Sequence, residues 1–305
     1  MSSLLVLEQI LNGLQFGITL FLMAAGLTLI FGIVGVLNLA HGSLYMFGAY
    51  VAASSFVYTG SFLLALVSAI VACGLVGLLL EVVLFRHIYQ RSHLDQVLAT
   101  FGLILTFNEG TKVIWGPRPL YLNVPDGLDF TIDLLPGLAY PAYRLAIILT
   151  GLFVAGAIYL LISHTRLGML IRAGASNREM LSALGSNVER LFLFVFALSA
   201  ILAGFAGAMV GPIQSVEVGI GEEILILAFV VVVIGGIGSV RGAFVGALLV
   251  GLVDTLGRAF LPGLFRLSFP ASSADAIGTT IATIAIYLLM AAVLLWRPHG
   301  LFTAR

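Results

Sequence analysis

Two stretches of this sequence contain almost no polar side chains, and they limit what the chain can fold into more than any other feature. Residues 224–234 and 277–296 are nearly unbroken apolar runs, and neither alternates between polar and apolar residues as the strands of a membrane barrel do. A water-soluble chain of this length needs polar side chains on its surface, yet 61% of the residues are hydrophobic and only 9% are charged. The chain therefore uses lipid as its solvent.

Backbone groups in hydrocarbon must be hydrogen-bonded within the structure, and without strand-like alternation only helices satisfy this requirement. The sequence therefore predicts an all-α polytopic membrane protein that forms one transmembrane domain over residues 1–305. A helix needs about 20 mostly apolar residues to cross the hydrocarbon, which gives about eight or nine crossings. The candidate segments are residues 9–34, 37–58, 61–85, 95–115, 142–163, 191–213, 222–239, 242–262 and 276–296.

The basic residues are divided unequally between the two sets of connecting segments. With nine crossings, one side carries Arg86, Arg91, Arg166, Arg172, Arg178, Arg190, Arg241, Arg297 and Arg305, and the other carries Lys112, Arg118, Arg144, Arg258 and Arg266. Basic residues accumulate in cytoplasmic loops, so we expect a cytoplasmic C-terminus and an external N-terminus. Residues 116–141 are then an external loop, and residues 164–190 are a cytoplasmic loop.

The sequence contains no pattern typical of a catalytic site. The Walker A motif and the H-E-x-x-H zinc motif are both absent, and no pair of carboxylates lies at helical spacing deep in a predicted span. We therefore expect no enzymatic activity and no cofactor in this chain, so that any ATP is hydrolysed by another subunit. The net charge is zero and Lys112 is the only lysine, which argues against nucleic acid as a partner.

The segment from Ser176 to Gly185 predicts a short helix outside the membrane, from about residue 177 to 184. Ser176 and Glu179 have the spacing of a capping box, and Gly185 suits the position just after a helix end. A helix this short needs its apolar side chains covered, and these are Met180, Leu181 and Leu184. They pack either against the chain's own transmembrane helices or in a groove of a partner, and both interpretations remain open.

Polar residues and a glycine interrupt the apolar sequence at Asn38, His41 and Gly42. Such an interruption at membrane depth is typical of a broken helix that lines a transport pathway. The alternative is a cytoplasmic turn in which Asn38 caps the next helix and His41 faces water, and the sequence does not decide between the two. A weak repeat relates His41-Gly42 to Arg241-Gly242, which leaves an internal duplication as an open hypothesis.

Other charged residues near or within the predicted spans suggest structural roles. Asp254 and Arg258 lie four residues apart and are expected to pair on one helix face. A structural role is favoured over a proton relay for this pair, because no chain of further carboxylates accompanies it. Glu222 and Glu223 lie near a predicted helix end, where solvation or capping is expected.

Several sequence blocks, taken together, resemble a known family. The blocks are Gly26-Leu27-Thr28-Leu29-Ile30-Phe31-Gly32, Asn38-Leu39-Ala40-His41-Gly42, Gly48-Ala49-Tyr50, Arg166-Leu167-Gly168 with Arg172-Ala173, Leu184-Gly185, Gly235-Gly236-Ile237-Gly238-Ser239-Val240-Arg241-Gly242 and Arg297-Pro298-His299-Gly300-Leu301-Phe302. Their order, and their spread over nearly the whole chain, resemble the permeases of high-affinity branched-chain amino acid ABC importers. The likeness is to the shorter of the two paired permease subunits.

The resemblance implies a multi-pass subunit of the bacterial inner membrane that has no ATPase site of its own. It implies as partners a second related permease, two ATPase subunits that use ATP and magnesium, and a periplasmic substrate-binding protein. It also implies that the ATPases couple to the segment from Arg172 to Gly185. The residues expected in this role are Arg172, Ala173, Ser176, Glu179, Met180, Leu181, Leu184 and Gly185. Arg172-Ala173-Gly174 departs from the E-A-A pattern of ABC importers in general.

Branched-chain or other hydrophobic amino acids are the substrates that the resemblance implies, with Asn38, His41 and Gly42 expected along the substrate pathway. Relatives in this family that carry urea, short amides or aromatic acids supply the alternative. A secondary transporter is a further alternative, and it needs ion-coupling groups within the membrane. Only Asp254 is a candidate for such a group, and it has Arg258 close by.

Overall fold

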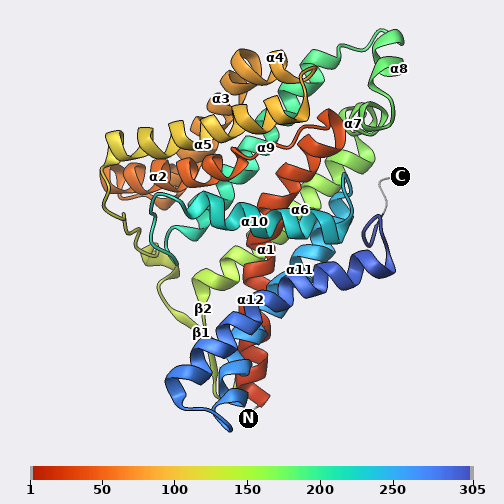
Figure 1. Ribbon diagram of the computed structural model, residues 1–305. Helices are drawn as coiled ribbons and strands as arrows, with labels where there is room; N and C mark the ends of the chain where they lie inside the picture. The colour runs from red at the N-terminus through yellow and green to blue at the C-terminus, as the bar shows by residue number, and fades with distance from the viewer. Residues whose placement is uncertain (1–2, 303–305) are drawn as a thin grey trace.

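The computed structural model describes residues 3–302, which form a bundle of long helices and one small β-hairpin (Figure 1). The helices of 16 residues or more in this part of the chain are α1 (Ser3–Val34), α2 (His41–Thr59), α3 (Phe62–Leu80), α5 (His93–Trp115), α6 (Ala142–His164), α9 (Val188–Val210), α10 (Ile220–Gly235), α11 (Val240–Phe265) and α12 (Ala271–Trp296). The shorter elements are η1 (Glu81–Phe85), α4 (Arg86–Ile88), η2 (Asp126–Leu128), β1 (Thr131–Leu135), β2 (Leu138–Pro141), α7 (Arg166–Ser176) and α8 (Arg178–Ala183).

Local sequence signals fix several of the helix ends. Gly60 ends α2 with a φ of 65°, a left-handed conformation that favours glycine, and its amide donates to the Phe56 carbonyl oxygen at 2.8 Å. Ser61 follows at once and caps α3, since its side chain accepts a hydrogen bond from the Leu64 amide. One turn of two residues therefore closes one helix and opens the next.

Helix α1 forms the centre of the bundle. In its most apolar window 89% of the residues are buried, and α1 packs against α6, α9, α10 and α11. The corresponding windows of α5, α6 and α12 are only 11%, 17% and 22% buried. Because apolar side chains on these outer helices are exposed, their outer surfaces face lipid or another membrane protein.

Within residues 3–302, seven helical segments are long and apolar enough to cross a membrane: α1, residues 62–88, α5, α6, α9, α11 and α12. The all-α polytopic class is thereby confirmed. Helices α2 and α10 do not meet the same criterion. The 16 residues of α10 span only about 24 Å, less than a bilayer core of about 30 Å, and α2 carries polar residues in its first turn. Eight or nine crossings remain a prediction.

The connections between the long helices gather at two opposite ends of the bundle (Figure 1). At one end the last turns of α1, α6 and α12 meet α7 and the start of α11 around one cavity. We call this the arginine-rich end, and its basic residues are Arg86, Arg91, Arg166, Arg172, Arg178, Arg190, Arg241 and Arg297. Arg305 lies outside the described residues.

The opposite end contains the start of α1 and the β-hairpin, in which β1 and β2 pair antiparallel. The hydroxyl of Tyr140 in β2 donates to the Asn12 side-chain oxygen at 3.1 Å, and Arg144 at the start of α6 donates to the same oxygen at 2.6 Å. Leu120 and Val216 also exchange two backbone hydrogen bonds of 2.9 Å, which join the segments after α5 and α9. Residues 116–141 are thus folded onto the bundle.

A cysteine introduced at Ser186 should be labelled from the cytoplasm, and one introduced at Asp129 should be labelled from outside. The reason is that the arginine-rich end contains the larger share of basic residues. The natural Cys73 is fully buried and should stay unlabelled, so that it can remain in place. A membrane-impermeant maleimide, applied to intact cells and to inverted vesicles, measures both positions. Labelling in the reverse sense would contradict the orientation.

Candidate functional site

The junction between α1 and α2 is a non-helical segment that runs back into the bundle. Helix α1 ends at Val34, and Gly35 has a φ of 74°. Helix α2 begins at His41, which lies beside Gly26, two turns before the end of α1. Two α-helical turns correspond to about 11 Å, so residues 35–40 descend by roughly this distance from the arginine-rich end.

His41 is fully buried, and both ring nitrogens face polar atoms of neighbouring helices. Nε2 lies 3.1 Å from the Met23 carbonyl oxygen of α1, and Nδ1 lies 3.5 Å from the Ser199 hydroxyl of α9. The pattern fits a neutral imidazole in which Nε2 donates to the carbonyl and Nδ1 accepts from the hydroxyl. The interpretation of His41 as a residue facing water is therefore wrong.

Asn38 does not cap α2 either. The residue at the N-cap position is Ala40, which makes no side-chain hydrogen bond to the helix. The side chain of Asn38 is fully buried, and within residues 3–302 neither its amide nitrogen nor its amide oxygen has a hydrogen-bond partner. The Ser43 hydroxyl in the first turn of α2 is also buried without a partner in this part of the chain. Buried polar groups are seldom left unpaired, so these atoms call for a functional explanation.

Gly42 allows two helices to meet backbone to backbone. A Cβ atom on Gly42 would lie 2.2 Å from the Gly221 carbonyl oxygen at the start of α10. The other end of α10 shows the same arrangement, because a Cβ on Gly242 would lie 1.9 Å from the Gly235 carbonyl oxygen. The glycines of the weak repeat thus hold the two ends of α10. No residue with a Cβ fits at either contact without moving a helix.

Helix α8 differs from its predicted form at its start. The residue that caps it is Asn177, whose side-chain oxygen accepts the Met180 amide at 2.9 Å. Ser176 is instead the last residue of α7, so the predicted capping box of Ser176 and Glu179 is wrong. Both Ser and Asn are good N-caps. The two candidates are neighbours in the sequence, so the observed cap lies one residue after the predicted one. Gly185 has the predicted left-handed conformation, with a φ of 81°.

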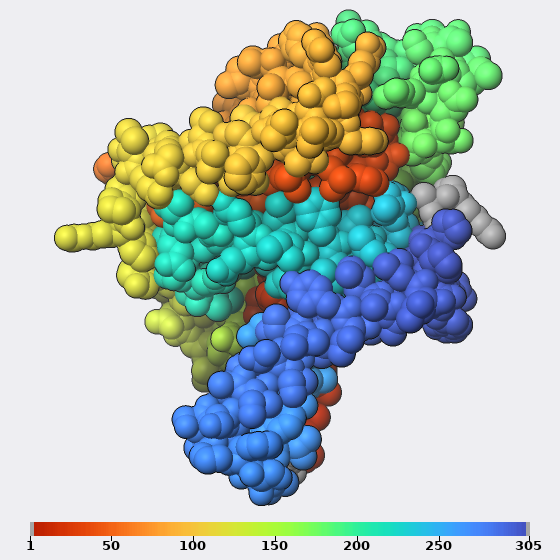
Figure 2. All heavy atoms as spheres, viewed as in Figure 1, coloured from red at the N-terminus to blue at the C-terminus, as the bar shows by residue number. Residues whose placement is uncertain are grey.

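The apolar residues of α8 divide between an inner and an outer face. Leu181 is 5% exposed and packs against the backbone of α7 near Gly174. Met180 and Leu184 are 58% and 76% exposed. Figure 2 shows α7 and α8 (green) projecting from the bundle at the arginine-rich end. Internal packing thus accounts for Leu181, while Met180 and Leu184 remain on the surface.

Helix α7 is fastened to the end of α6. The Thr165 side chain caps it by accepting the Gly168 amide at 3.0 Å, and Arg172 donates to the Ile162 carbonyl oxygen. Ala173 and Glu179 are exposed. The residues predicted for coupling therefore lie together on one projecting unit of two short helices.

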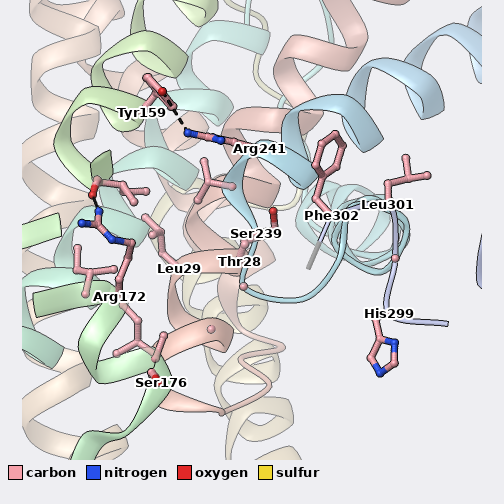
Figure 3. A pocket seen from close by; sticks show the side chains of 18 of the residues that line it. Thr28, Leu29, Tyr159, Arg172, Ser176, Ser239, Arg241, His299, Leu301 and Phe302 are labelled. Atoms are coloured by element: carbon pink, nitrogen blue, oxygen red, sulfur yellow. Dashed lines mark hydrogen bonds between the residues drawn. The ribbon is translucent and has the colours of Figure 1, made fainter. Parts of the chain in front are cut away.

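Two cavities flank the last turn of α1, and both include Gly32 and Ile33. The larger has a volume of about 960 Å³, and we call it the arginine cavity (Figure 3). Its polar wall contains Thr28, Tyr159, Arg172, Ser176, Ser239, Arg241, Arg297 and His299. The smaller cavity, of about 840 Å³, is lined by residues 32–36 and by residues 174–179. It therefore connects the start of the α1–α2 junction to the start of α8.

Sequence reasoning missed the partners of the buried polar segment. Ser199 lies in apolar sequence that gave no signal. Gly221 is one of many glycines, and no sequence pattern identifies the Met23 carbonyl as a partner. Glu222 was expected to be solvated or capping. It is only partly exposed, and it accepts a hydrogen bond of 2.6 Å from Asn108 of α5. Asp254 pairs with Arg258 at 2.7 Å, as predicted.

Comparison with known proteins gives consistent matches. The profile of the family described as "Branched-chain amino acid transport system / permease component" matches residues 9–295. The high-affinity branched-chain amino acid transport system permease protein BraD of Pseudomonas aeruginosa is 28% identical, over 97% of this chain and 95% of its own. The permease protein LivH of the corresponding Escherichia coli system is 29% identical, over 84% of this chain and 87% of its own.

A more distant relative is named for a different substrate. The ribose import permease protein RbsC of Escherichia coli is 27% identical, over 76% of this chain and 72% of its own. No solved structure matches the chain significantly. The family profile covers almost every helix of the bundle, from the first turns of α1 to the end of α12, and the chain therefore belongs to the permease family of branched-chain amino acid transport systems.

Proposed function

We propose that this chain is the transmembrane permease subunit of an ATP-driven importer for branched-chain or other hydrophobic amino acids. The observation that carries the proposal is the match along nearly the full chain to BraD and LivH, whose names state this substrate class. The importer would also contain a second related permease, two ATPases and a periplasmic substrate-binding protein. The chain would cross the bacterial inner membrane about eight or nine times, with its arginine-rich end in the cytoplasm.

The segment from Asn38 to Gly42 is proposed as part of the substrate pathway. The residues just before it, 32–36, line a cavity at the arginine-rich end, and His41 lies deep in the bundle beside Gly26. Asn38 and Ser43 supply polar atoms without partners in residues 3–302. An amino acid that passes through an apolar bundle must exchange its water for such groups, because an unpaired charge in hydrocarbon costs many kcal/mol.

The unit of α7 and α8 is proposed as the surface that couples transport to ATP hydrolysis. Met180 and Leu184 supply the exposed apolar contacts, and Leu181 supplies the inward contact. A projecting amphipathic helix suits a hydrophobic groove on a partner. Leu181 of α8, Leu191 of α9 and Ile33 of α1 all lie close to Gly174, because a Cβ atom built on this glycine would be 3.3 to 3.5 Å from each of them. Motion of α8 would therefore pass to the bundle at Gly174.

A second candidate is an importer of the same architecture for another small polar solute. The match to RbsC, named as a ribose import permease, supports it. Uptake of radiolabelled leucine and of ribose by the reconstituted importer, each with ATP and its binding protein, separates the two. Uptake driven by an ion gradient without ATP would instead indicate a secondary transporter.

Leu184→Asp should weaken the binding of the ATPase subunits by about ten- to a hundredfold. A charge placed in an apolar groove loses about 1 to 3 kcal/mol of contact energy. Ser182→Asp is the matched control, because Ser182 is an exposed residue of the same helix and the change adds the same charge. Co-purification of the ATPases and the melting temperature of the permease are measured together. Normal ATPase recovery with a lowered melting temperature would show that Leu184 packs internally and would contradict the docking role.

Asn177→Ala should destabilise α8 by about 1 kcal/mol, because it removes the oxygen that accepts the Met180 amide. Ser176→Ala should leave α8 nearly unchanged, since Ser176 belongs to α7. Hydrogen exchange at the amides of residues 179–184 reports the difference directly. Faster exchange in the Ser176 variant than in the Asn177 variant would contradict the cap at Asn177 and support the capping box of Ser176 and Glu179.

His41→Leu should lower ATP-driven uptake by about tenfold or more while the protein still inserts and assembles. Leucine cannot form a hydrogen bond with the Met23 carbonyl or the Ser199 hydroxyl. If this loss changes the free-energy difference between the two access states of the permease by about 1.4 kcal/mol, the ratio of their populations shifts tenfold. Ser199→Ala removes only the longer of the two contacts and serves as the milder control. Uptake in proteoliposomes is compared with expression and ATPase recovery. Unchanged uptake at normal expression would exclude the segment from the pathway.

A further inference from the structure

Three arginine side chains line the arginine cavity, and the described chain leaves their charges unpaired. Arg172 comes from α7, Arg241 from α11, and Arg297 follows α12. No aspartate or glutamate lines this cavity, and within residues 3–302 none of the three has a carboxylate at ion-pair distance. Arg258 and Arg266, in contrast, each pair with an aspartate. The described side chains that line the cavity therefore carry net positive charge.

The three guanidinium groups contact only neutral partners. Arg172 donates to the Ile162 carbonyl oxygen, and Arg241 donates to the Tyr159 hydroxyl at 3.1 Å (Figure 3). Arg297 lies over the Trp296 ring at 5.4 Å. A guanidinium has five N–H donors, so each group keeps donors for an anion.

The backbone adds positive potential to the same wall. Residues 238–241 form the start of α11, a helix of 26 residues whose first amides carry a partial positive charge. Thr28 of α1 also lines the cavity, and its hydroxyl is buried, at 1% exposure for the residue, without a hydrogen-bond partner in the described chain. The cavity thus offers a helix N-terminus and three guanidinium groups.

The cavity opens where aromatic side chains mark the membrane surface. Leu295 and Trp296 at the end of α12 are 88% and 77% exposed, and Tyr159 near the end of α6 is 41% exposed. Tryptophan and tyrosine at helix ends lie at the level of the lipid head groups. A phosphate that reaches this cavity at that depth comes from a lipid more readily than from bulk water.

We infer that the arginine cavity binds the phosphate of an anionic phospholipid head group, such as that of phosphatidylglycerol. Basic pockets between membrane helices hold such head groups. The inference uses the membrane embedding of the chain and does not depend on which solute the proposed importer carries.

The test uses the full-length permease in neutral detergent, with native mass spectrometry to measure retention of phosphatidylglycerol and phosphatidylcholine. Phosphatidylglycerol should bind more tightly, and Arg241→Gln and Arg297→Gln should each weaken it about fivefold and together about 25-fold. Arg190→Gln is the matched control, because Arg190 is an exposed residue of the same end that does not line the cavity. It should bind like the unchanged protein, and all variants should melt alike without lipid.

Three outcomes would overturn the inference. Equal retention of the two lipids by the unchanged protein would show no anionic preference. Stabilisation by millimolar inorganic phosphate that matches the effect of phosphatidylglycerol would assign the cavity to a soluble anion. Loss of ATPase recovery in the double variant, with retention of phosphatidylglycerol unchanged, would assign the arginines to an acidic partner surface.

Discussion

Backbone-to-backbone contact at both ends of α10 determines how the other helices can pack. Gly221 meets Gly42 at the start of α2, and Gly235 meets Gly242 at the start of α11, each so closely that no side chain fits between. Lipid offers no hydrophobic drive for helices to associate, so close approach through small residues is a main source of packing energy. The short helix α10 can remain deep in the bundle because neighbouring backbones enclose it at both ends. The positions of α2 and α11 follow from these two contacts.

A separate set of contacts connects the buried polar segment to the projecting helices. Gly42 follows His41, and residues 35–40 join His41 to the last turn of α1, where Ile33 lies close to Gly174 of α7. Gly174 in turn lies beside Leu181, the single buried residue of α8. Packed interiors transmit displacement because they contain few voids. The α1–α2 junction and α8 are therefore joined by a few packed contacts.

The sequence predicts the helical class and most segment limits well, because long apolar runs leave a chain in lipid few alternatives. It also predicts the pairing of Asp254 with Arg258 and the helix end at Gly185, both of which depend on neighbours within five residues. It fails at the cap of α8, where Ser176 and Asn177 are equally suitable. It leaves Asn38 and His41 undecided, because residues that enclose this segment, Ser199 beside His41 and Gly221 beside Gly42, lie far away in the chain. Local patterns contain no information on such distant contacts.

Residues at the end of the described chain form hydrogen bonds with the last turn of α10, a helix that is synthesised much earlier. The amides of Leu301 and Phe302 donate to the carbonyl oxygens of Ile234 and Gly235 at 2.8 and 3.0 Å, and these carbonyls lie at the last turn of α10. Synthesis runs from the N-terminus, so α11 and α12 must both leave the ribosome before these two hydrogen bonds can form. Until then the end of α10 has carbonyl groups without these partners. Closure of the bundle at this end can therefore come only after residue 302 has been synthesised.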